Sequence, residues 1–336
     1  MVAMADVSNR DILFSFFMFT ANLNPGDADY AQTIVKHMHK LKRMGYAGFD
    51  LPIAPTETTD RQSEVESYEG LRRTLVEAGL GDLRFTTNVA ATSPCDPSSP
   101  DEQTRQSALL YLRSRVDITK ALGGDIMAGP IVVPYGVFPT AQPGEGIWSN
   151  ALQLWLAQRY QNALPVICEL GKYAQEKGVR LAIEPVDHWE TPGPNLVREV
   201  MDFVEKVQSP YVGLCVDSAH VVLGSDGPEV FESEMESVSD DQPLHYVHIS
   251  APDRGAVHKS WIPWKAFLKH FKNYQGPFLV EVFNAIPVFQ SPLRLTRRKF
   301  WIDGEDDPDL GTLSAYEVAR RAIAAVRHEF SEVGFI

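Results

Sequence analysis

An apolar stretch precedes each of four ionisable residues in this sequence, Glu184, Asp217, His248 and Glu281. Each stretch has the length and the aliphatic character of a buried strand. In parallel α/β proteins the carboxyl ends of the strands face the ligand crevice, so a side chain placed there can reach a bound molecule. We therefore expect three carboxylates and one imidazole to meet at one end of a sheet.

Three carboxylates and an imidazole form a hard-to-borderline ligand set. This set suits Mn²⁺, with Mg²⁺ or Co²⁺ as alternatives, and leaves coordination positions open for substrate or water. Without a metal the carboxylates would repel one another and raise one another's pKa. The alternative is that one or two of them form ion pairs at the rim of the fold, which is reasonable for a single residue but weaker for all four. The sequence predicts a divalent-metal site and no organic cofactor.

Eight strand-like stretches alternate with helical patterns along the chain, and parallel strands need such crossover helices. The alternation predicts an α/β fold with a single (β/α)8 barrel that spans residues 1–336. An open doubly wound sheet is less favoured, because no GxGxxG motif follows the first strand and no change of composition marks a second domain. The predicted strands are Ile12–Phe19, Ala47–Leu51, Leu83–Val89, a stretch within Asp125–Val133, Val179–Glu184, Val212–Asp217, His245–Ser250 and Pro277–Phe283. The predicted helices are Tyr30–Met44, Ser63–Ala78, Asp101–Leu122, Ser149–Lys177, Asn195–Val207, Pro228–Val238, Trp264–Asn273 and Ser314–Phe330.

Three connections that follow predicted strands are longer than a barrel needs, namely Pro52–Gln62, Pro134–Trp148 and Asn284–Gly311. In a barrel they would lie on the catalytic face, and loops of this length are usually functional or disordered. The extended loop 284–311 after the eighth strand is expected to be a packed lid, a substrate cover or a surface for a partner chain. Phe17 and Trp301 are candidate aromatic walls of a substrate site, with core packing as the alternative.

The composition is that of an ordinary globular chain, with 336 residues of which 44% are hydrophobic and 22% charged. The net charge of −13 argues against a nucleic-acid partner, since phosphate binding needs clustered Lys and Arg. Three cysteines without a CxxC pair predict reduced thiols and a cytoplasmic setting. The N-terminus lacks the order of a signal peptide, and the apolar run ILFSFFMF is too short to span a bilayer, so no membrane association is expected.

The positions of the four strand-end residues resemble those of the xylose isomerase-like TIM barrels, the sugar isomerase/epimerase superfamily. The metal pattern Glu…Asp…His…Glu of its ketose 3-epimerases, the tagatose/allulose type, falls on Glu184, Asp217, His248 and Glu281. The resemblance implies that all four residues bind the metal. It also implies that Glu184 and Glu281 act as a facing acid/base pair.

Three further positions match the same family. Glu190 stands six residues after the first Glu, His220 completes an Asp-x-x-His motif, and Arg254 stands six residues after the metal His. The resemblance implies that Glu190 and Arg254 bind the substrate, and that His220 binds a sugar hydroxyl or serves as a base. The alternatives are a turn cap for Glu190, a surface ion pair for Arg254 and a hydrogen-bonded rim histidine for His220. Asp187 and His188 are expected to be loop residues rather than ligands, because of their spacing from the first Glu.

The chain is longer than a typical 3-epimerase, and it is more similar to the large α subunit of bacterial C-glycoside deglycosidases. That similarity rests on the segments FFMFTANLNP, GYAGFDLPIAP and LRLTRRKFW. It implies cleavage of 3-oxo-C-glycosides by elimination next to the sugar ketone, with a small β subunit as the partner in a hetero-oligomer. This is the first functional hypothesis, and a ketose 3-epimerase or related sugar isomerase is the alternative.

Two other classes of protein are less favoured. A metal-dependent phosphodiester hydrolase of the endonuclease type would share the architecture. The charge of −13 and the single His among the four ligands count against it. A non-enzymatic binding barrel would leave the acid cluster without a purpose.

Overall fold

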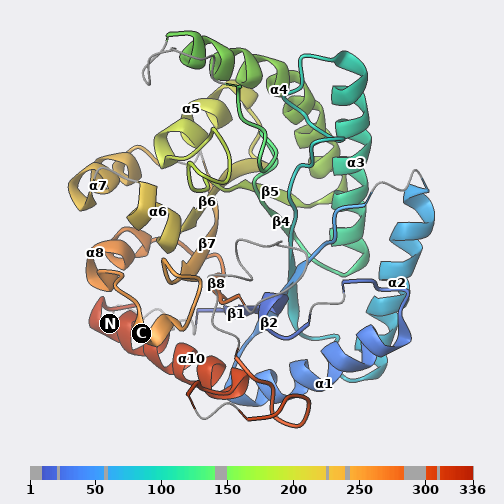
Figure 1. Ribbon diagram of the computed structural model, residues 1–336. Helices are drawn as coiled ribbons and strands as arrows, with labels where there is room; N and C mark the ends of the chain where they lie inside the picture. Colours follow the sequence, from blue (N-terminus) through green and yellow to red (C-terminus); the bar gives the residue numbers. More distant parts are fainter. Residues whose placement is uncertain are drawn as a thin grey trace, which may run out of the picture.

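The computed structural model describes residues 10–20, 23–56, 60–140, 150–224, 227–238, 243–283, 300–308 and 311–335. Eight parallel strands follow one another around a closed barrel in the order of the sequence (Figure 1). This topology confirms the predicted (β/α)8 barrel. The strands are β1 (Ile12–Ser15), β2 (Gly48–Pro52), β3 (Arg84–Asn88), β4 (Ile126–Gly129), β5 (Arg180–Ile183), β6 (Val212–Asp217), β7 (Leu244–Ser250) and β8 (Phe278–Glu281).

A ring of helices surrounds the strands (Figure 1). Its members are α1 (Ala28–Met44), α2 (Arg61–Glu77), α3 (Glu102–Ala121), α4 (Asn150–Lys177), α5 (Val197–Val207), α6 (Ser218–Gly224), α7 (Pro228–Glu236), α8 (Trp264–Leu268) and α10 (Ala315–Glu332). Three short 3-10 turns, η1 (Phe16–Met18), η2 (Val257–Lys259) and η3 (Lys269–Phe271), complete the described elements. The last helix closes the ring, because α10 packs against both α1 and α8. Within the described part of the chain, no helix is long and apolar enough to cross a membrane.

Side chains from six of the eight strands fill the interior of the barrel, two of them from β4. These inward residues are Leu13, Ile126, Ala128, Ala182, Cys215, Tyr246 and Leu279, and together they form a cluster separate from the core under the helices. Side chains two residues apart on a strand point to the same face. Because Ala182, Cys215, Tyr246 and Leu279 point inward, the residue two positions after each of them also points inward, at the mouth of the barrel.

The differences from the predicted elements include one shortened strand and one additional helix. The predicted strand Ile12–Phe19 stops at Ser15, because Phe16–Met18 turn into η1 and the Ser15 hydroxyl accepts the N–H of Phe17. The helix α6 was absent from the prediction and starts directly after β6. The carboxylate of Asp217 accepts the backbone N–H groups of Ala219 and His220, at 2.6 and 3.2 Å, and so caps the first turn of α6.

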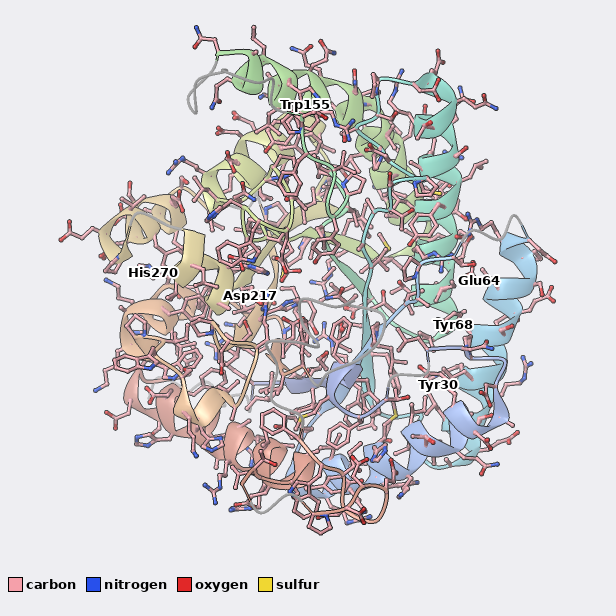
Figure 2. All side chains as sticks on the ribbon, in the orientation of Figure 1. Tyr30, Glu64, Tyr68, Trp155, Asp217 and His270 are labelled. Carbon is pink, nitrogen blue, oxygen red and sulfur yellow. The ribbon has the colours of Figure 1, made fainter. Side chains whose placement is uncertain are left out.

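The ring of helices also buries polar groups. His37 of α1 is fully buried, and its Nδ1 lies 2.6 Å from the hydroxyl of Tyr316 in α10. Arg115 of α3 is also fully buried and forms a two-pronged ion pair with Glu64 of α2, at 2.8 and 2.5 Å. Figure 2 shows Glu64 and Tyr68 on α2, in the outer ring, whereas Asp217 lies inside it.

All three long predicted loops are described only in part. The residues outside the described ones are 57–59 of the loop Pro52–Gln62, 141–149 of the loop Pro134–Trp148, and 284–299 and 309–310 of the loop Asn284–Gly311. The described part of the loop Asn284–Gly311 leads to α10. There Phe300 is buried, and Trp301 pairs with Ser314 at the start of the helix.

Candidate metal and active site

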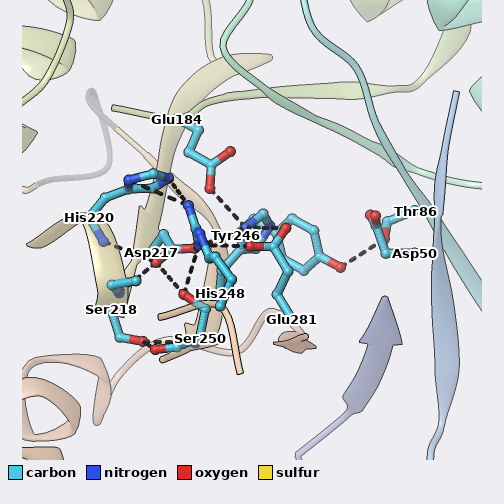
Figure 3. Close-up of polar contacts among 12 residues, drawn as sticks. Asp50, Thr86, Glu184, Asp217, Ser218, His220, Tyr246, His248, Ser250 and Glu281 are labelled. Atoms are coloured by element: carbon cyan, nitrogen blue, oxygen red, sulfur yellow. Dashed lines mark hydrogen bonds and ion pairs between the residues drawn. The ribbon is translucent and has the colours of Figure 1, made fainter. Parts of the chain in front are cut away.

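The four strand-end residues meet at the carboxyl end of the barrel (Figure 3). Glu184 follows β5, Asp217 ends β6, His248 lies in β7 and Glu281 ends β8. Asp217 pairs with His248 across the sheet. One ligand atom from each of the four residues lies within 4.8 Å of the others, so neighbouring strands bring the predicted set together.

The imidazole of His248 lies at the centre of the four-residue cluster. Its Nδ1 is 3.0 Å from Glu184 Oε1, 3.9 Å from Asp217 Oδ2 and 3.8 Å from Glu281 Oε1. All four residues are at most 4% exposed. Three carboxylates withdrawn from water in this way repel one another unless positive charge is supplied.

The cluster fits a divalent metal ion. It offers three carboxylates and one imidazole at mutual distances that a single ion can span. Glu184, Asp217, His248 and Glu281 would hold the ion. The donor set is that of Mn²⁺, Mg²⁺ or Co²⁺ and does not distinguish between them.

Arg254 supplies positive charge to the same cluster. Its Nη1 donates to Asp217 Oδ2 at 2.9 Å and to Glu281 Oε2 at 3.1 Å, and its Nη2 contacts His220 Nε2. Burial opposes ionisation of Asp217, but the guanidinium and the nearby imidazoles outweigh it and lower the pKa of Asp217. At Glu281 burial dominates over His248 and Arg254, and raises the pKa of that carboxyl above its ordinary value. The two carboxylates on Arg254 are thus driven toward opposite protonation states.

A second group of polar side chains, those of Asp187, Glu190 and His220, lies beside the four-residue cluster. His220 Nδ1 is 3.3 Å from Asp187 Oδ1 and 3.9 Å from Glu190 Oε2. Asp187 lies in the loop after β5, as its spacing predicted, but its side chain is buried and aimed at His220. No sequence pattern predicts this contact, because it joins a loop to the first turn of the helix that follows the next strand.

Tyr135 is a second residue that the sequence did not single out. It lies in the loop after β4, and the backbone N–H of the next residue, Gly136, donates to the carbonyl of Glu190 at 2.9 Å. Burial and the carboxylates of Glu190 and Glu184 raise the pKa of Tyr135 well above its ordinary value. The residue as a whole is 39% exposed, so part of it remains open to solvent.

The two aromatic residues predicted to line a substrate site lie in different surroundings. Phe17 is buried in η1 and packs edge-on against Phe283, with ring centroids 4.6 Å apart. Phe283 in turn lies 5.3 Å from the guanidinium of Arg254, which places the Phe17–Phe283 pair next to the cluster. Trp301 donates its indole N–H, at 3.4 Å, to the carbonyl of Thr312, which precedes α10 in the sequence. Its role as a substrate wall stays a prediction.

A buried polar chain forms the floor of the site. Thr86 Oγ1 donates to Asp50 Oδ2 at 2.6 Å and lies 2.7 Å from the hydroxyl of Tyr246 (Figure 3). The ring of Tyr246 packs edge-on against His248, with ring centroids 4.7 Å apart. Burial raises the pKa of Asp50 to about 6, although its bond to Thr86 opposes the shift.

We expect Asp50 to make the stability of the metal-free protein pH-dependent. A carboxyl whose pKa is higher in the folded state stabilises that state below its unfolded pKa and loses this contribution as pH rises through about 6. Between pH 4 and 7 the free energy of unfolding should fall by about 2 kcal/mol relative to the Asp50→Asn variant. Urea unfolding of both proteins across this range measures the difference, and a constant difference would show that Asp50 ionises normally.

Comparison with known proteins places these features in a family. The model of the family described as xylose isomerase-like TIM barrel matches residues 38–299. The L-ribulose 3-epimerase of Methylomonas sp. (strain DH-1) is 26% identical over 233 residues, which cover 68% of this chain and 72% of the relative. The D-psicose 3-epimerase of Enterocloster bolteae is 23% identical over 309 residues, which cover 90% of this chain and 91% of the relative.

Solved structures share the fold over nearly the whole chain. A protein of Anabaena variabilis, provisionally assigned as a sugar phosphate isomerase/epimerase, is 51% identical with a TM-score of 0.92. The match covers 97% of this chain and 100% of that one. The D-allulose 3-epimerase of Methylomonas sp. in complex with D-allulose is 21% identical with a TM-score of 0.74, over 95% of this chain and 97% of that one.

Proposed function

We propose that this chain, which belongs to the xylose isomerase-like TIM barrel family, is a divalent-metal-dependent sugar epimerase that acts next to the carbonyl of a ketose. The observation that carries the proposal is the buried cluster of Glu184, Asp217, His248 and Glu281. Several relatives are named ketose 3-epimerases, which favours inversion at the carbon adjacent to the ketone. This ranks the epimerase above the C-glycoside deglycosidase that the long loop had suggested.

Proton transfer by two carboxylates is the core of the proposed reaction. When bound, a divalent metal would polarise the sugar carbonyl and orient the neighbouring hydroxyl. Glu184 takes the proton from the carbon next to the carbonyl, and the C–H electron pair moves into the carbonyl to give an enolate. Glu281 returns a proton to the opposite face of that carbon. Exchange with solvent then removes the proton from Glu184 and restores one to Glu281, so the pair returns to its starting state.

The polar residues around the pair would hold the sugar. Arg254 and His220 already contact each other and can each turn one polar atom toward a substrate oxygen. Glu190 has a partly exposed side chain and a buried Oε2 without a hydrogen bond, which suits a sugar hydroxyl as donor. We expect these three to contribute orientation, which is worth several kcal/mol only if the reacting groups are well aligned.

The second candidate is the catalytic α subunit of a C-glycoside deglycosidase, which acts on 3-oxo-C-glycosides with a small β subunit. One observation favours it. Tyr135, Phe138 and Trp189, on the loops after β4 and β5, are 39%, 43% and 56% exposed. Exposed aromatic side chains of this kind would suit an aromatic aglycone.

One experiment separates the two candidates. The chain alone, loaded with Mn²⁺, is incubated in D₂O with D-fructose, D-allulose, D-tagatose, L-ribulose and a phosphorylated ketose, and separately with a 3-oxo-C-glucoside. Deuterium entering the carbon next to the ketone together with the epimeric ketose supports the epimerase. Release of free aglycone without ketose turnover supports the deglycosidase, and the absence of both results would overturn the epimerase.

Metal removal should abolish activity and lower stability together. A chelator is expected to reduce turnover at least about 100-fold, because carbonyl polarisation is worth several kcal/mol. Restoring free Mn²⁺ to 100 times its Kd should raise the free energy of unfolding by about 2.7 kcal/mol. Turnover and thermal unfolding are measured before and after chelation. An unchanged Tm on Mn²⁺ addition would contradict binding to the folded chain.

A further inference from the structure

We propose that Asp187 is a positioning residue that fixes the tautomer of His220. Both side chains are nearly inaccessible, at 4% and 2% exposure, and the two are joined by a contact of 3.3 Å between Oδ1 and Nδ1. Neither the sequence pattern nor the family match gives Asp187 a role. Its effect on catalysis rests on the proposed function, whereas its effect on the histidine does not.

The contact of His220 with Arg254 decides which ring nitrogen carries the proton. Arg254 Nη2 lies within hydrogen-bond distance of His220 Nε2, and a guanidinium can only donate. His220 Nε2 must therefore be the acceptor, with its lone pair toward Arg254. A neutral imidazole then carries its proton on Nδ1.

Asp187 is the carboxylate that receives this proton. Its Oδ1 is buried and makes no hydrogen bond within the described part of the chain, and His220 Nδ1 lies 3.3 Å from it, so a proton on that nitrogen would give Oδ1 the donor it lacks. Glu190 Oε2 also faces Nδ1, but from 3.9 Å, beyond hydrogen-bond distance. One N–H serves one carboxylate, and the shorter contact assigns it to Asp187. Glu190 is thereby left for a substrate hydroxyl.

The backbone holds Asp187 in place before any substrate arrives. Its carbonyl accepts the N–H groups of Glu190 and Thr191, at 2.8 and 3.2 Å, which closes a tight turn. The amide of Asn195 donates to the carbonyls on both sides of this turn, at Val186 and Thr191, at 2.6 and 3.1 Å. A carboxylate on such a constrained turn is already ordered, so it orients an imidazole at little additional cost in conformational entropy.

The resulting relay runs from Asp187 through His220 to Arg254. A carboxylate behind an imidazole fixes the tautomer and the ring plane, and it increases the basicity of the far nitrogen. Here the far nitrogen, Nε2, faces the guanidinium that also bonds Asp217 and Glu281. The relay therefore connects the loop after β5 to the metal cluster, and it presents Nε2 as an acceptor for a sugar hydroxyl when Arg254 moves to the substrate.

The tautomer can be read directly by ¹⁵N NMR of the Mg²⁺-loaded protein, with the His220 signals assigned by their loss in His220→Gln. We expect a protonated Nδ1 and an unprotonated Nε2 in the native protein. Asp187 and Asp217 favour a second proton on the ring against burial and Arg254, and the net effect raises the pKa of His220, so spectra are recorded from about pH 6 to 9. A ring protonated on Nε2 throughout this range would overturn the proposal.

Variants connect the tautomer to its cause. Asp187→Asn, which keeps the shape of the side chain, should convert the Nδ1–H form to a mixture of tautomers and lower kcat/KM about 10- to 100-fold. Glu190→Gln should leave the tautomer unchanged, and the exposed Asp202→Asn on α5 should change neither quantity. If Asp187→Asn does not fold, the tautomer of the native protein and that of Glu190→Gln still test the assignment, because a change of tautomer in Glu190→Gln would refute it. If the tautomer shifts in Asp187→Asn while the native protein turns over no ketose, the proposed function fails and the positioning role stands.

Discussion

Replacement of Glu281 by Gln is expected to lower turnover about 1,000-fold, the middle of the range for loss of a general acid or base. Glu281 is 2% exposed and lies 3.8 Å from His248, so its carboxylate is needed both for the proton and for the ion. The amide keeps the shape of the side chain but can neither exchange a proton nor neutralise a cation. Steady-state turnover of ketoses and Mn²⁺ binding by calorimetry measure the two losses.

A matched substitution controls for the loss of one negative charge. Glu176 lies exposed on α4, and Glu176→Gln should change neither turnover nor the affinity for Mn²⁺. Glu281→Gln with full activity would rule out the four-residue cluster as the active site. Normal Mn²⁺ affinity with lost turnover would instead restrict Glu281 to proton transfer.

Removal of the Glu64 carboxylate is expected to give the largest loss of stability, about 3–5 kcal/mol for Glu64→Ala. The carboxylate makes two hydrogen bonds, at 2.8 and 2.5 Å, to the guanidinium of Arg115, which is fully buried between α2 and α3. Without it a charge remains in the interior with no counter-charge, because the other contact of Arg115 Nη1 is a carbonyl at 3.4 Å, that of Ala54. Urea unfolding of the native and variant proteins measures the difference.

The same helix supplies the control for this prediction. Arg113 of α3 pairs with Glu169 at 3.4 Å, but both side chains are exposed, at 36% and 58%. Glu169→Ala should therefore change the free energy of unfolding by less than about 1 kcal/mol. The double variant Glu64→Leu with Arg115→Met should regain most of the loss, because it leaves no unpaired charge. Equal losses for Glu64→Ala and Glu169→Ala would contradict the distinction.

Different parts of the chain bear on the choice between the two sugar reactions. The metal cluster is compatible with both, because each begins with proton loss next to a ketone. The relatives that carry ketose 3-epimerase names favour the epimerase. The segment LRLTRRKFW, which suggested the deglycosidase, lies mostly outside the described residues, so the long loop offers no structural test.

The sequence alone determined the barrel and the meeting of its four strand-end residues. Both follow from local rules: an alternating βα pattern requires parallel strands, and an acid or imidazole that ends such a strand must face the common mouth. The same rules fixed the inward direction of Asp217 and His248, since each stands two residues after a barrel-filling side chain, Cys215 and Tyr246.

Only the tertiary structure decided which loop and helix residues join the site and which polar residues become interior. Asp187 and Tyr135 lie on loops, and no periodicity of the sequence predicts that one reaches His220 and the other approaches Glu190. His37 of α1 is buried because α10 closes over it. Strand periodicity aims a side chain within its own element, but a contact between elements depends on how distant segments pack, and that information is not local.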